Sequence, residues 1–268
     1  MTGTSFDDHE RERWAGRAAA YERTFARLCA YPAGALLDAA GAGAGMRVLD
    51  VGTGPGTVAA LAAGRGATVV AVDAEASMLA GARRAVPGAR LAHAVLPHLP
   101  VATGGVDAAV ANFVLNHVGD PAAAVAELAR TVRPGGRIAA TVWPWPQPPL
   151  QRLWGEVFAD VDGGELPRLA AERDFPRTEK GLTGLLAEAG LDDVRCRTLT
   201  WTHRADPDEW WTGPASGLGI PGLLLERQLP ATREALRRRY LELSARYRDA
   251  DGLLALPTAA LLACAVVR

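Results

Sequence analysis

The residues with the clearest chemical meaning lie in a glycine-rich segment and at the end of the apolar run that follows it. Residues 48–56 read VLDVGTGPG, so the carboxylate of Asp50 precedes glycines at every second position. Glycine tolerates a positive φ and lets a ligand lie directly on the backbone. Asp73 follows the apolar run VVAV at residues 69–72, where a carboxylate can accept hydrogen bonds from both hydroxyls of a ribose. Together the two features predict a nucleoside-binding site.

The glycine spacing argues against a dinucleotide as the ligand. A dinucleotide fingerprint, G-x-G-x-x-G, requires a third glycine where this chain has Thr57. Here the glycines stand at positions 52, 54 and 56, and an acidic residue stands two positions before the first of them. The spacing therefore favours a different nucleoside.

This segment resembles the first motif of the class I S-adenosylmethionine-dependent methyltransferases. The resemblance covers residues 46–143 and is closest to the small-molecule branch that includes the ubiquinone- and menaquinone-biosynthesis methyltransferases. Residues 73–79 resemble that family's second motif, residues 106–117 its fourth strand and the turn after it, and residues 133–137 the turn before its fifth strand. The resemblance implies S-adenosylmethionine as cofactor, S-adenosylhomocysteine as product and no metal ion. An acidic residue at position 50 suits a ligand that carries an ammonium and a sulfonium.

The resemblance also implies a set of cofactor contacts. Asp73 would bind the ribose, and Met78 would pack on the adenine. Many relatives have a Gly-Asp-Ala segment where this chain has Ala94, Val95 and Leu96, so backbone groups of Val95 and Leu96 would read the adenine edge. The complete predicted set is Tyr21, Asp50, Gly52, Thr53, Gly54, Gly56, Asp73, Ala74, Met78, Val95, Leu96, Asn112 and His117.

A general base is harder to identify. His117 follows the predicted fourth strand and is the one catalytic candidate, since a base near neutral pKa accelerates proton removal about 10²–10⁴-fold. A histidine in such a turn is more often a structural hydrogen-bonding group. The sequence shows no other acid–base pattern, which favours an acceptor that is already nucleophilic, such as an amine, an electron-rich ring or an enolate.

The tryptophans point to an acceptor site. All seven lie outside residues 15–142, in the leading segment and after the predicted cofactor-binding core. Large aromatic surfaces there can line an apolar acceptor pocket, or they can simply fill irregular insertions. Tyr21 likewise can close over the cofactor or only pack. The predicted acceptor contacts are Trp14, Tyr21, Phe113, Trp143 and Trp145.

A parallel sheet would bring these residues to one edge. Short apolar runs, each typical of a buried parallel strand, occur at Met46–Val51, Ala67–Val72, Val106–Ala111 and Gly136–Val142, with a weaker one near Arg90–Val95. Helical patterns lie between them at Val58–Ala63, Glu75–Ala85 and Ala122–Val132. This alternation predicts an α/β fold with a doubly wound, Rossmann-like sheet. The family resemblance implies seven strands, mostly parallel, with an antiparallel last strand near Leu253–Val267.

The remaining segments predict a substrate cap built around one integrated domain. Residues 1–45 would form an N-terminal cap of one or two helices over residues 8–41, residues 46–143 the cofactor-binding core, and residues 144–268 the rest of the sheet. Four prolines between residues 144 and 149 predict a stiff surface loop. A helix near Thr178–Ala189 and a strand near Val194–Thr202 follow. The insertions 144–177 and 204–250 would complete the acceptor pocket.

Composition limits the partners. With 29 Lys plus Arg against 30 Asp plus Glu, the formal net charge is −1, which disfavours nucleic acid and anionic membranes as partners. Cys29, Cys196 and Cys264 show no paired spacing and are interpreted as reduced core residues. The polar N-terminus and the lack of a long apolar run predict a cytoplasmic protein that neither is exported nor spans a membrane, as a monomer or homodimer.

The sequence therefore predicts methyl transfer to a small, apolar or aromatic molecule at oxygen, nitrogen or carbon, in bacterial specialised or cofactor metabolism. Two alternatives stay open. One is a methyltransferase acting on protein or nucleic acid, although residues 112–115 read NFVL and lack the Asn/Asp-Pro-Pro-aromatic motif of such relatives. The other is a methyltransferase-like scaffold that serves as a lyase, a cyclase or a binding module.

Overall fold

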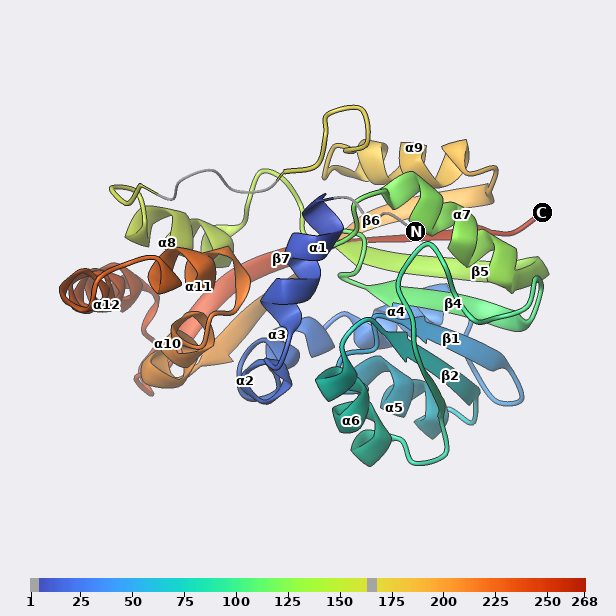
Figure 1. The fold of residues 1–268 in the computed structure, drawn as a ribbon, viewed down its shortest axis with the longest axis horizontal. Coiled ribbons are helices and arrows are strands. Elements are labelled where there is room, and N and C mark those ends of the chain that lie inside the picture. The colour runs from blue at the N-terminus through green and yellow to red at the C-terminus, as the bar shows by residue number, and fades with distance from the viewer. Residues whose placement is uncertain (1–4, 163–167) are drawn as a thin grey trace.

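A seven-stranded sheet forms the centre of the computed structural model, which describes residues 5–162 and 168–268 (Figure 1). The strand order is β3-β2-β1-β4-β5-β7-β6, and every strand is parallel to its neighbours except β7, which is antiparallel to both β5 and β6. The strands are β1 (Arg47–Val51), β2 (Thr68–Asp73), β3 (Arg90–His93), β4 (Val106–Asn112), β5 (Val132–Val142), β6 (Asp192–Ala205) and β7 (Leu254–Val266). The predicted fold class, with its antiparallel last strand, is confirmed.

Small apolar side chains let the central strands be covered on both faces. Residues 108–111 of β4 are all fully buried, as are residues 139 and 140 of β5. Parallel strands covered on both faces have continuous rather than alternating apolar sequences. One boundary differs from the prediction, because β5 begins at Val132, which pairs with Val106 ahead of an irregularity in the register.

Helices cover both faces of the sheet (Figure 1). On one face, α7 (Pro121–Thr131) and α9 (Glu179–Glu188) pack into the core that contains Leu128 and Leu182. On the other face lie α4 (Ala33–Ala39), α5 (Thr57–Gly64) and α6 (Ala76–Ala85). Capping side chains fix two of these helices, since Asp120 accepts a hydrogen bond from the Ala123 amide and Thr178 accepts one from the Gly181 amide.

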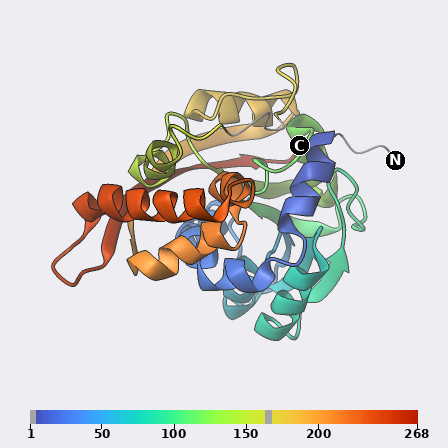
Figure 2. The ribbon, with the colours of Figure 1, turned by 60° about the vertical axis from the view of Figure 1, so that its left-hand side comes forward.

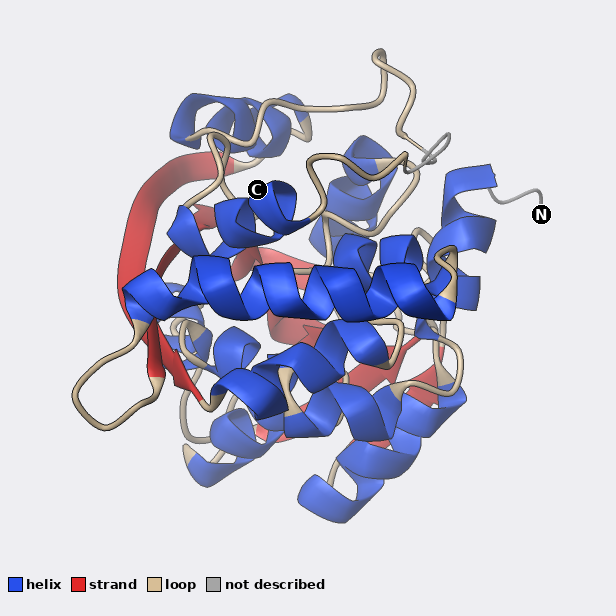
Figure 3. Cartoon of the chain, turned by 90° about the vertical axis from the view of Figure 1, so that its left-hand side faces the viewer, coloured by secondary structure: helices blue, strands red, loops and turns tan. Residues whose placement is uncertain are grey.

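The other helices gather at one end of the sheet and form a cap (Figures 1 and 3). The longest of them, α12, crosses the near face in Figure 3. The cap helices are α1 (Ser5–Trp14), α2 (Ala18–Arg23), α3 (Phe25–Ala30), α8 (Pro149–Val157), α10 (Pro207–Ala215), α11 (Gly219–Glu226), α12 (Pro230–Ser244) and the 3-10 helix η1 (Ala245–Tyr247). Strands β6 and β7 extend into the cap, where Trp201 and Leu256 join a second, aromatic-rich core.

One expectation about the cap was wrong in detail, and one helix was not predicted. The leading segment forms four short helices, α1 to α4, instead of one or two. Residues 144–148 form a loop without helix or strand, as predicted. The helix α8 follows this loop, because Pro149 occupies a first-turn position and residues 150, 153, 154 and 157 place buried apolar side chains on one face.

Within residues 5–162 and 168–268, no helix has the length and apolar character needed to cross a membrane. The same ranges contain no group of three or more His, Cys, Asp or Glu side chains arranged to hold a metal ion.

Candidate active site

A cavity of about 500 Å³ lies where the carboxyl ends of β1, β2 and β4 face α1 and the cap. This is where open α/β sheets bind ligands, and the volume falls within the range of about 300–1,000 Å³ usual for ligand pockets. The sheet supplies Val51, Val72 and Asp73 to its wall, and the cap supplies Trp154 and Trp210. In Figure 2, α1, the blue helix next to the N-terminus, lies beside the orange helices of the cap.

The glycine-rich turn after β1 forms part of the wall through Gly52 and Gly54. Their φ values are 63° and 54°, a region that glycine adopts without steric cost. A Cβ on Gly52 would overlap the side chain of Val114. Glycine is therefore required at position 52, because Val114 fills the space that a side chain there would need.

Asp73 is held at the floor of the cavity by two backbone amides. Its Oδ2 accepts a hydrogen bond from the Gly54 amide at 2.8 Å, and its Oδ1 accepts one from the Glu75 amide at 2.9 Å. Burial raises the pKa of Asp73 above its ordinary value, and the two amides partly oppose that rise. Each carboxylate oxygen keeps a lone pair free to accept a further hydrogen bond from a ligand.

Asp50 occupies a different position from the one predicted. Its side chain is 1% exposed and does not line the cavity. Oδ2 accepts a hydrogen bond from the Thr53 hydroxyl at 2.7 Å, whereas Oδ1 has no partner in the described part of the chain. Burial raises the pKa of Asp50 to about 7, although the bond from Thr53 lowers it.

Thr53 and Gly56 also lie behind the cavity wall rather than in it. Gly56 is the N-cap of α5 with φ 92°, and a Cβ there would stand 2.9 Å from the Cα of Ala82 in α6. Asp50, Thr53 and Gly56 thus shape the turn and the α5–α6 packing from behind the cavity wall, and their contact with the cofactor stays a prediction.

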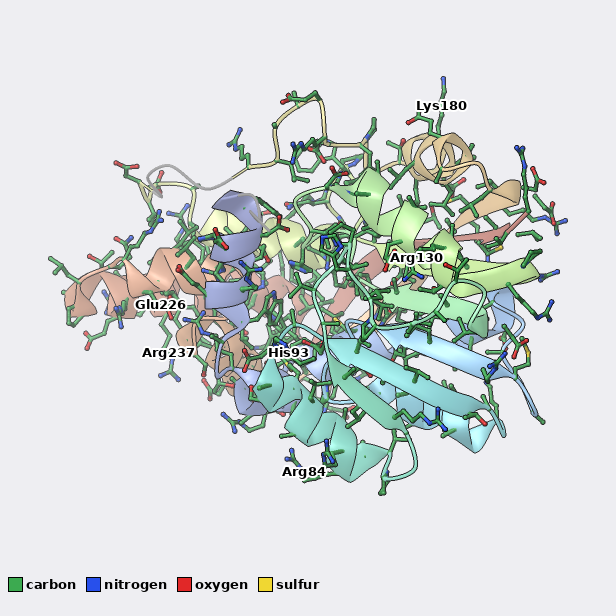
Figure 4. All side chains as sticks on the ribbon, turned by 45° about the vertical axis from the view of Figure 1, so that its right-hand side comes forward. Arg84, His93, Arg130, Lys180, Glu226 and Arg237 are labelled. Atoms are coloured by element: carbon green, nitrogen blue, oxygen red, sulfur yellow. The ribbon has the colours of Figure 1, made fainter. Side chains whose placement is uncertain are left out.

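The predicted adenine-binding residues line the cavity together. Ala74, Met78, Val95 and Leu96 all belong to its wall. The Ala94 amide donates a hydrogen bond to the Asp73 carbonyl at 3.0 Å, which holds the segment after β3 against the end of β2. His93, labelled in Figure 4, contacts the Ala74 carbonyl through Nε2 at 2.8 Å and fixes the other side of this corner.

Tyr21 and Asn112 both contact Cys29. This cysteine lines the cavity, whereas a place in the hydrophobic core was predicted for it. The amide nitrogen of Asn112 donates to the Cys29 carbonyl at 2.8 Å, and its amide oxygen accepts a hydrogen bond from the Thr141 hydroxyl at 2.7 Å. The Tyr21 hydroxyl pairs with the Cys29 thiol. Burial raises the pKa of Cys29 to about 12 and that of Tyr21 well above 10, so both stay protonated at neutral pH.

His117 lines the cavity and has an acidic partner that the sequence did not reveal. Its Nδ1 lies 2.7 Å from Oε2 of Glu10 on α1, and the Trp14 ring stands edge-on to the imidazole at 5.4 Å between centroids. Residues 10 and 117 are far apart in sequence, so no spacing pattern links them.

Aromatic side chains line the side of the cavity nearest the cap. The Phe113 and Trp143 rings stack with centroids 3.9 Å apart and planes at 17°, and Trp154 and Trp210 extend this wall. Trp145 does not take part, because its side chain points to solvent and is 65% exposed. The predicted acceptor contact is therefore corrected for Trp145, whereas Trp14, Tyr21, Phe113 and Trp143 all line the cavity.

Several other residues that line the cavity were not predicted from the sequence. They come from segments whose positions only the folded chain defines, and they include Glu10, Phe25, Leu28, Cys29, Gln147, Gln151, Trp154, Trp210 and Leu224. For Trp154 and Trp210 the sequence did carry a signal, because all seven tryptophans lie outside residues 15–142. Both are buried positions, in α8 and α10.

Comparisons with known proteins agree with this geometry. Residues 49–140 match the family described as a methyltransferase domain. The chain is 35% identical over 180 residues to a demethylmenaquinone methyltransferase of Beutenbergia cavernae, covering 62% of this chain and 74% of that protein. A demethylmenaquinone methyltransferase of Clavibacter sepedonicus is 32% identical over 172 residues, covering 59% and 70%. The YcgJ protein of Bacillus subtilis shares the fold, with a TM-score of 0.58 at 19% identity over 89% of this chain and 98% of that one.

Proposed function

The chain belongs to the class I S-adenosylmethionine-dependent methyltransferases, and from that premise we propose that it methylates a small, apolar or aromatic acceptor. The observation that carries this proposal is a single cavity with two unlike sides. One side presents the glycine turn and a buried carboxylate, and the other presents stacked aromatic rings.

The sheet side of the cavity fits S-adenosylmethionine. Gly52 and Gly54 line the cavity, and Asp73 keeps lone pairs that suit a ribose diol. Met78, 4% exposed, offers an apolar surface for the adenine beside Val95 and Leu96. Bound there, S-adenosylmethionine supplies a methyl group that is already activated for transfer.

The protein then has to align the two reactants and exclude water. Alignment can remove much of the entropic barrier to a bimolecular step. Phe113 is placed for this role, because the turn after β4 positions it with φ 60° and its amide donates to the Thr141 hydroxyl at 2.9 Å. A non-glycine residue in this region is strained and is retained only where its surroundings hold it.

The acceptor side favours a flat, apolar molecule. Phe25, Leu28, Trp143 and Trp154 supply apolar surface, while Gln147 and Gln151 provide a few polar contacts for orientation. The two curated relatives are named for demethylmenaquinone, an aromatic quinone, which supports an acceptor of that chemical class. The alignment with the Beutenbergia relative covers only 62% of this chain, so the aromatic side can differ in shape.

Calorimetric titration with S-adenosylhomocysteine tests the cofactor side. We expect the wild-type protein to bind and Asp73→Ala to bind at least about tenfold more weakly, because a hydrogen bond to a charged group contributes about 1.5–3 kcal/mol. Asp107→Ala is the matched control, since Asp107 pairs with Arg133 at 2.7 Å, near the start of β4 and away from the cavity. Equal affinity of the wild type and Asp73→Ala would contradict the assignment.

Isotopically methyl-labelled S-adenosylmethionine tests the acceptor side. The enzyme is incubated with a fractionated cell extract, and labelled products are identified by mass spectrometry. We expect a labelled product of low mass with an aromatic or otherwise apolar skeleton. Tight cofactor binding with no labelled product from any fraction would instead favour a scaffold that has lost methyl transfer.

A further inference from the structure

The His117–Glu10 pair joins two distant parts of the chain inside the cavity. His117 lies in the turn after β4, and Glu10 lies on α1. Both side chains line the cavity, with Nδ1 and Oε2 at 2.7 Å. Trp14 packs edge-on against the imidazole at 5.4 Å and limits its rotation from the side of α1.

Glu10 is ionised in this setting. Burial acts to raise the pKa of Glu10, but the hydrogen bond from His117 and the positive charges nearby together lower the pKa below its ordinary value. Arg13 and His9 on α1 act in the same direction. A carboxylate can only accept hydrogen bonds, so Nδ1 of His117 must carry the proton.

Other charged groups around His117 belong to three segments. From α1, Asp7 accepts a hydrogen bond from the Gly119 amide at 2.6 Å, two residues beyond His117. From the turn itself, Asp120 is engaged in capping α7. From the segment before α9, Arg177 donates to the side chain of Asn116 at 3.3 Å. Among the hydrogen bonds of the described residues, the one made by the imidazole is that from Nδ1 of His117 to the Glu10 carboxylate.

We propose that Glu10 is a positioning residue that holds His117 as the general base of the reaction, with Nε2 unprotonated and available to the acceptor. This proposal rests on the methyltransferase function proposed above. It replaces the expectation of an acceptor that is already nucleophilic. The acceptor class it identifies is a neutral molecule with an acidic O–H or N–H group, either at the methylated atom or conjugated with it, as in a phenol, a hydroquinone or an enol.

The proton and electron movements balance within the site. The acceptor's O–H or N–H bond breaks, and its proton moves to Nε2 of His117. The electron pair released, at that atom or at the conjugated carbon, forms the bond to the donated methyl carbon, while the pair of the carbon–sulfur bond goes to sulfur. The carboxylate of Glu10 stabilises the imidazolium, which then passes its proton to water.

Nitrogen NMR of the imidazole tests the positioning role without any acceptor. The His117 signals are assigned by comparison with His117→Ala, and the ring tautomer is determined with S-adenosylhomocysteine bound. We expect the neutral imidazole of wild-type His117 to carry its proton on Nδ1, whereas the two tautomers mix in Glu10→Gln. Glu12→Gln is the matched control, because Glu12 lies on the same helix and is exposed.

Steady-state kinetics distinguish a positioning role of Glu10 from a purely structural one. Once a labelled acceptor is known, we expect Glu10→Gln to lower kcat about 10–100-fold, with the KM for S-adenosylmethionine within twofold of wild type. Glu12→Gln should leave kcat and both KM values unchanged.

The outcomes distinguish this inference from the proposed function. Failure of the wild type to bind S-adenosylhomocysteine overturns the proposed function itself. If the cofactor binds but the tautomer of His117 is the same in Glu10→Gln, the positioning role is overturned. The role of His117 as base is overturned if the methylated atom carried no exchangeable proton in the acceptor and was not conjugated with a group that carried one.

Discussion

Asp50 and Asp73 end neighbouring strands, yet their carboxylates have different surroundings. Asp73 faces the cavity and accepts hydrogen bonds from two amides. Asp50 lies beneath the glycine turn with one oxygen bonded to Thr53 and the other without a partner among the described residues. A buried acceptor without a hydrogen bond is costly, and more so when it is charged. Asp73 is thus suited to a ligand, and Asp50 carries an electrostatic cost.

That cost predicts a pH dependence of stability in the protein without ligand. The pKa of Asp50 rises from 3.8 to about 7 on folding, so between these values the native state binds more protons than the unfolded state. The free energy of unfolding attributable to Asp50 is therefore highest below pH 4 and falls by up to about 1.4 kcal/mol per pH unit until pH 7. We expect Asp50→Asn, which mimics the neutral acid and can still accept from Thr53, to gain stability relative to wild type from pH 5 to pH 8.

Differential scanning calorimetry at pH 5, 6, 7 and 8 measures this difference. Asp107→Asn serves as the comparison, because the Arg133 hydrogen bond, with a smaller opposing effect of burial, lowers the pKa of Asp107 instead of raising it. A constant difference between Asp50→Asn and wild type at all four pH values would show that Asp50 is ionised throughout.

At the residue scale, local motifs were predictable and distant partners were not. Gly52, Gly54 and Asp73 were found from sequence because one turn and one strand end place them. Glu10 and Cys29 were missed, because only the packing of the leading helices brings them to the cavity. The sequence also could not show that Asp50 lies behind the turn, since a strand end fixes position along the sheet and not access to the cavity.

At the scale of elements, the β1–α5 turn and the α5–α6 contact depend on Gly56. Its φ of 92° and the 2.9 Å approach of a Cβ to Ala82 Cα predict that Gly56→Ala destabilises the protein by roughly 2 kcal/mol or more. Gly64→Ala, at the other end of α5, meets no atom within 4 Å and should instead stabilise by about 0.4–1 kcal/mol. Urea denaturation of both variants measures this contrast, and equal effects would rule out the packing role.

The segment after β5 offers a second contrast, between two tryptophans only two residues apart. Trp143 stacks on Phe113 inside the cavity, whereas Trp145 is 65% exposed. Because a lost stacking surface weakens acceptor binding, we expect Trp143→Ala to lower kcat/KM for the acceptor about tenfold or more and Trp145→Ala to leave it unchanged. Steady-state kinetics with the labelled acceptor decides this, and an effect of Trp145→Ala alone would reverse the assignment.

Sheet elements were easier to predict than cap elements. Short continuous apolar runs such as those of β1, β2, β4 and β5 are typical of buried parallel strands, so the positions of these strands followed from the sequence. The leading segment was predicted as one or two helices, but breaks at residues 15–17, 24 and 31–32 divide it into four. Short helices gain their stability from tertiary packing, which a local pattern does not contain.

At the scale of the whole molecule, a ligand that contacts both the sheet and the cap should stabilise the folded protein against unfolding. At about 100 times its Kd, a ligand specific for the native state adds about 2.7 kcal/mol to the free energy of unfolding, which corresponds to a rise in Tm of roughly 5–10 °C for a chain of this size. We expect S-adenosylhomocysteine to produce a rise of this order in wild type and a much smaller one, at the same concentration, in Asp73→Ala. Thermal shift measurements test this, with Asp107→Ala expected to behave like wild type.

The packing of α1 against the cap affects when methyl transfer can begin in a catalytic cycle. Arg13 and Arg17 donate hydrogen bonds to the Gly217 carbonyl, and Arg17 also pairs with Glu226 at 2.7 Å, which Figure 4 labels on the cap. Because α1 carries Glu10, a molecule in which this helix has swung away has an incomplete proton-accepting centre even when the methyl donor is in place. We therefore expect such a molecule to be inactive. The methyl donor is then not consumed before the acceptor binds, and transfer begins only after both reactants are enclosed.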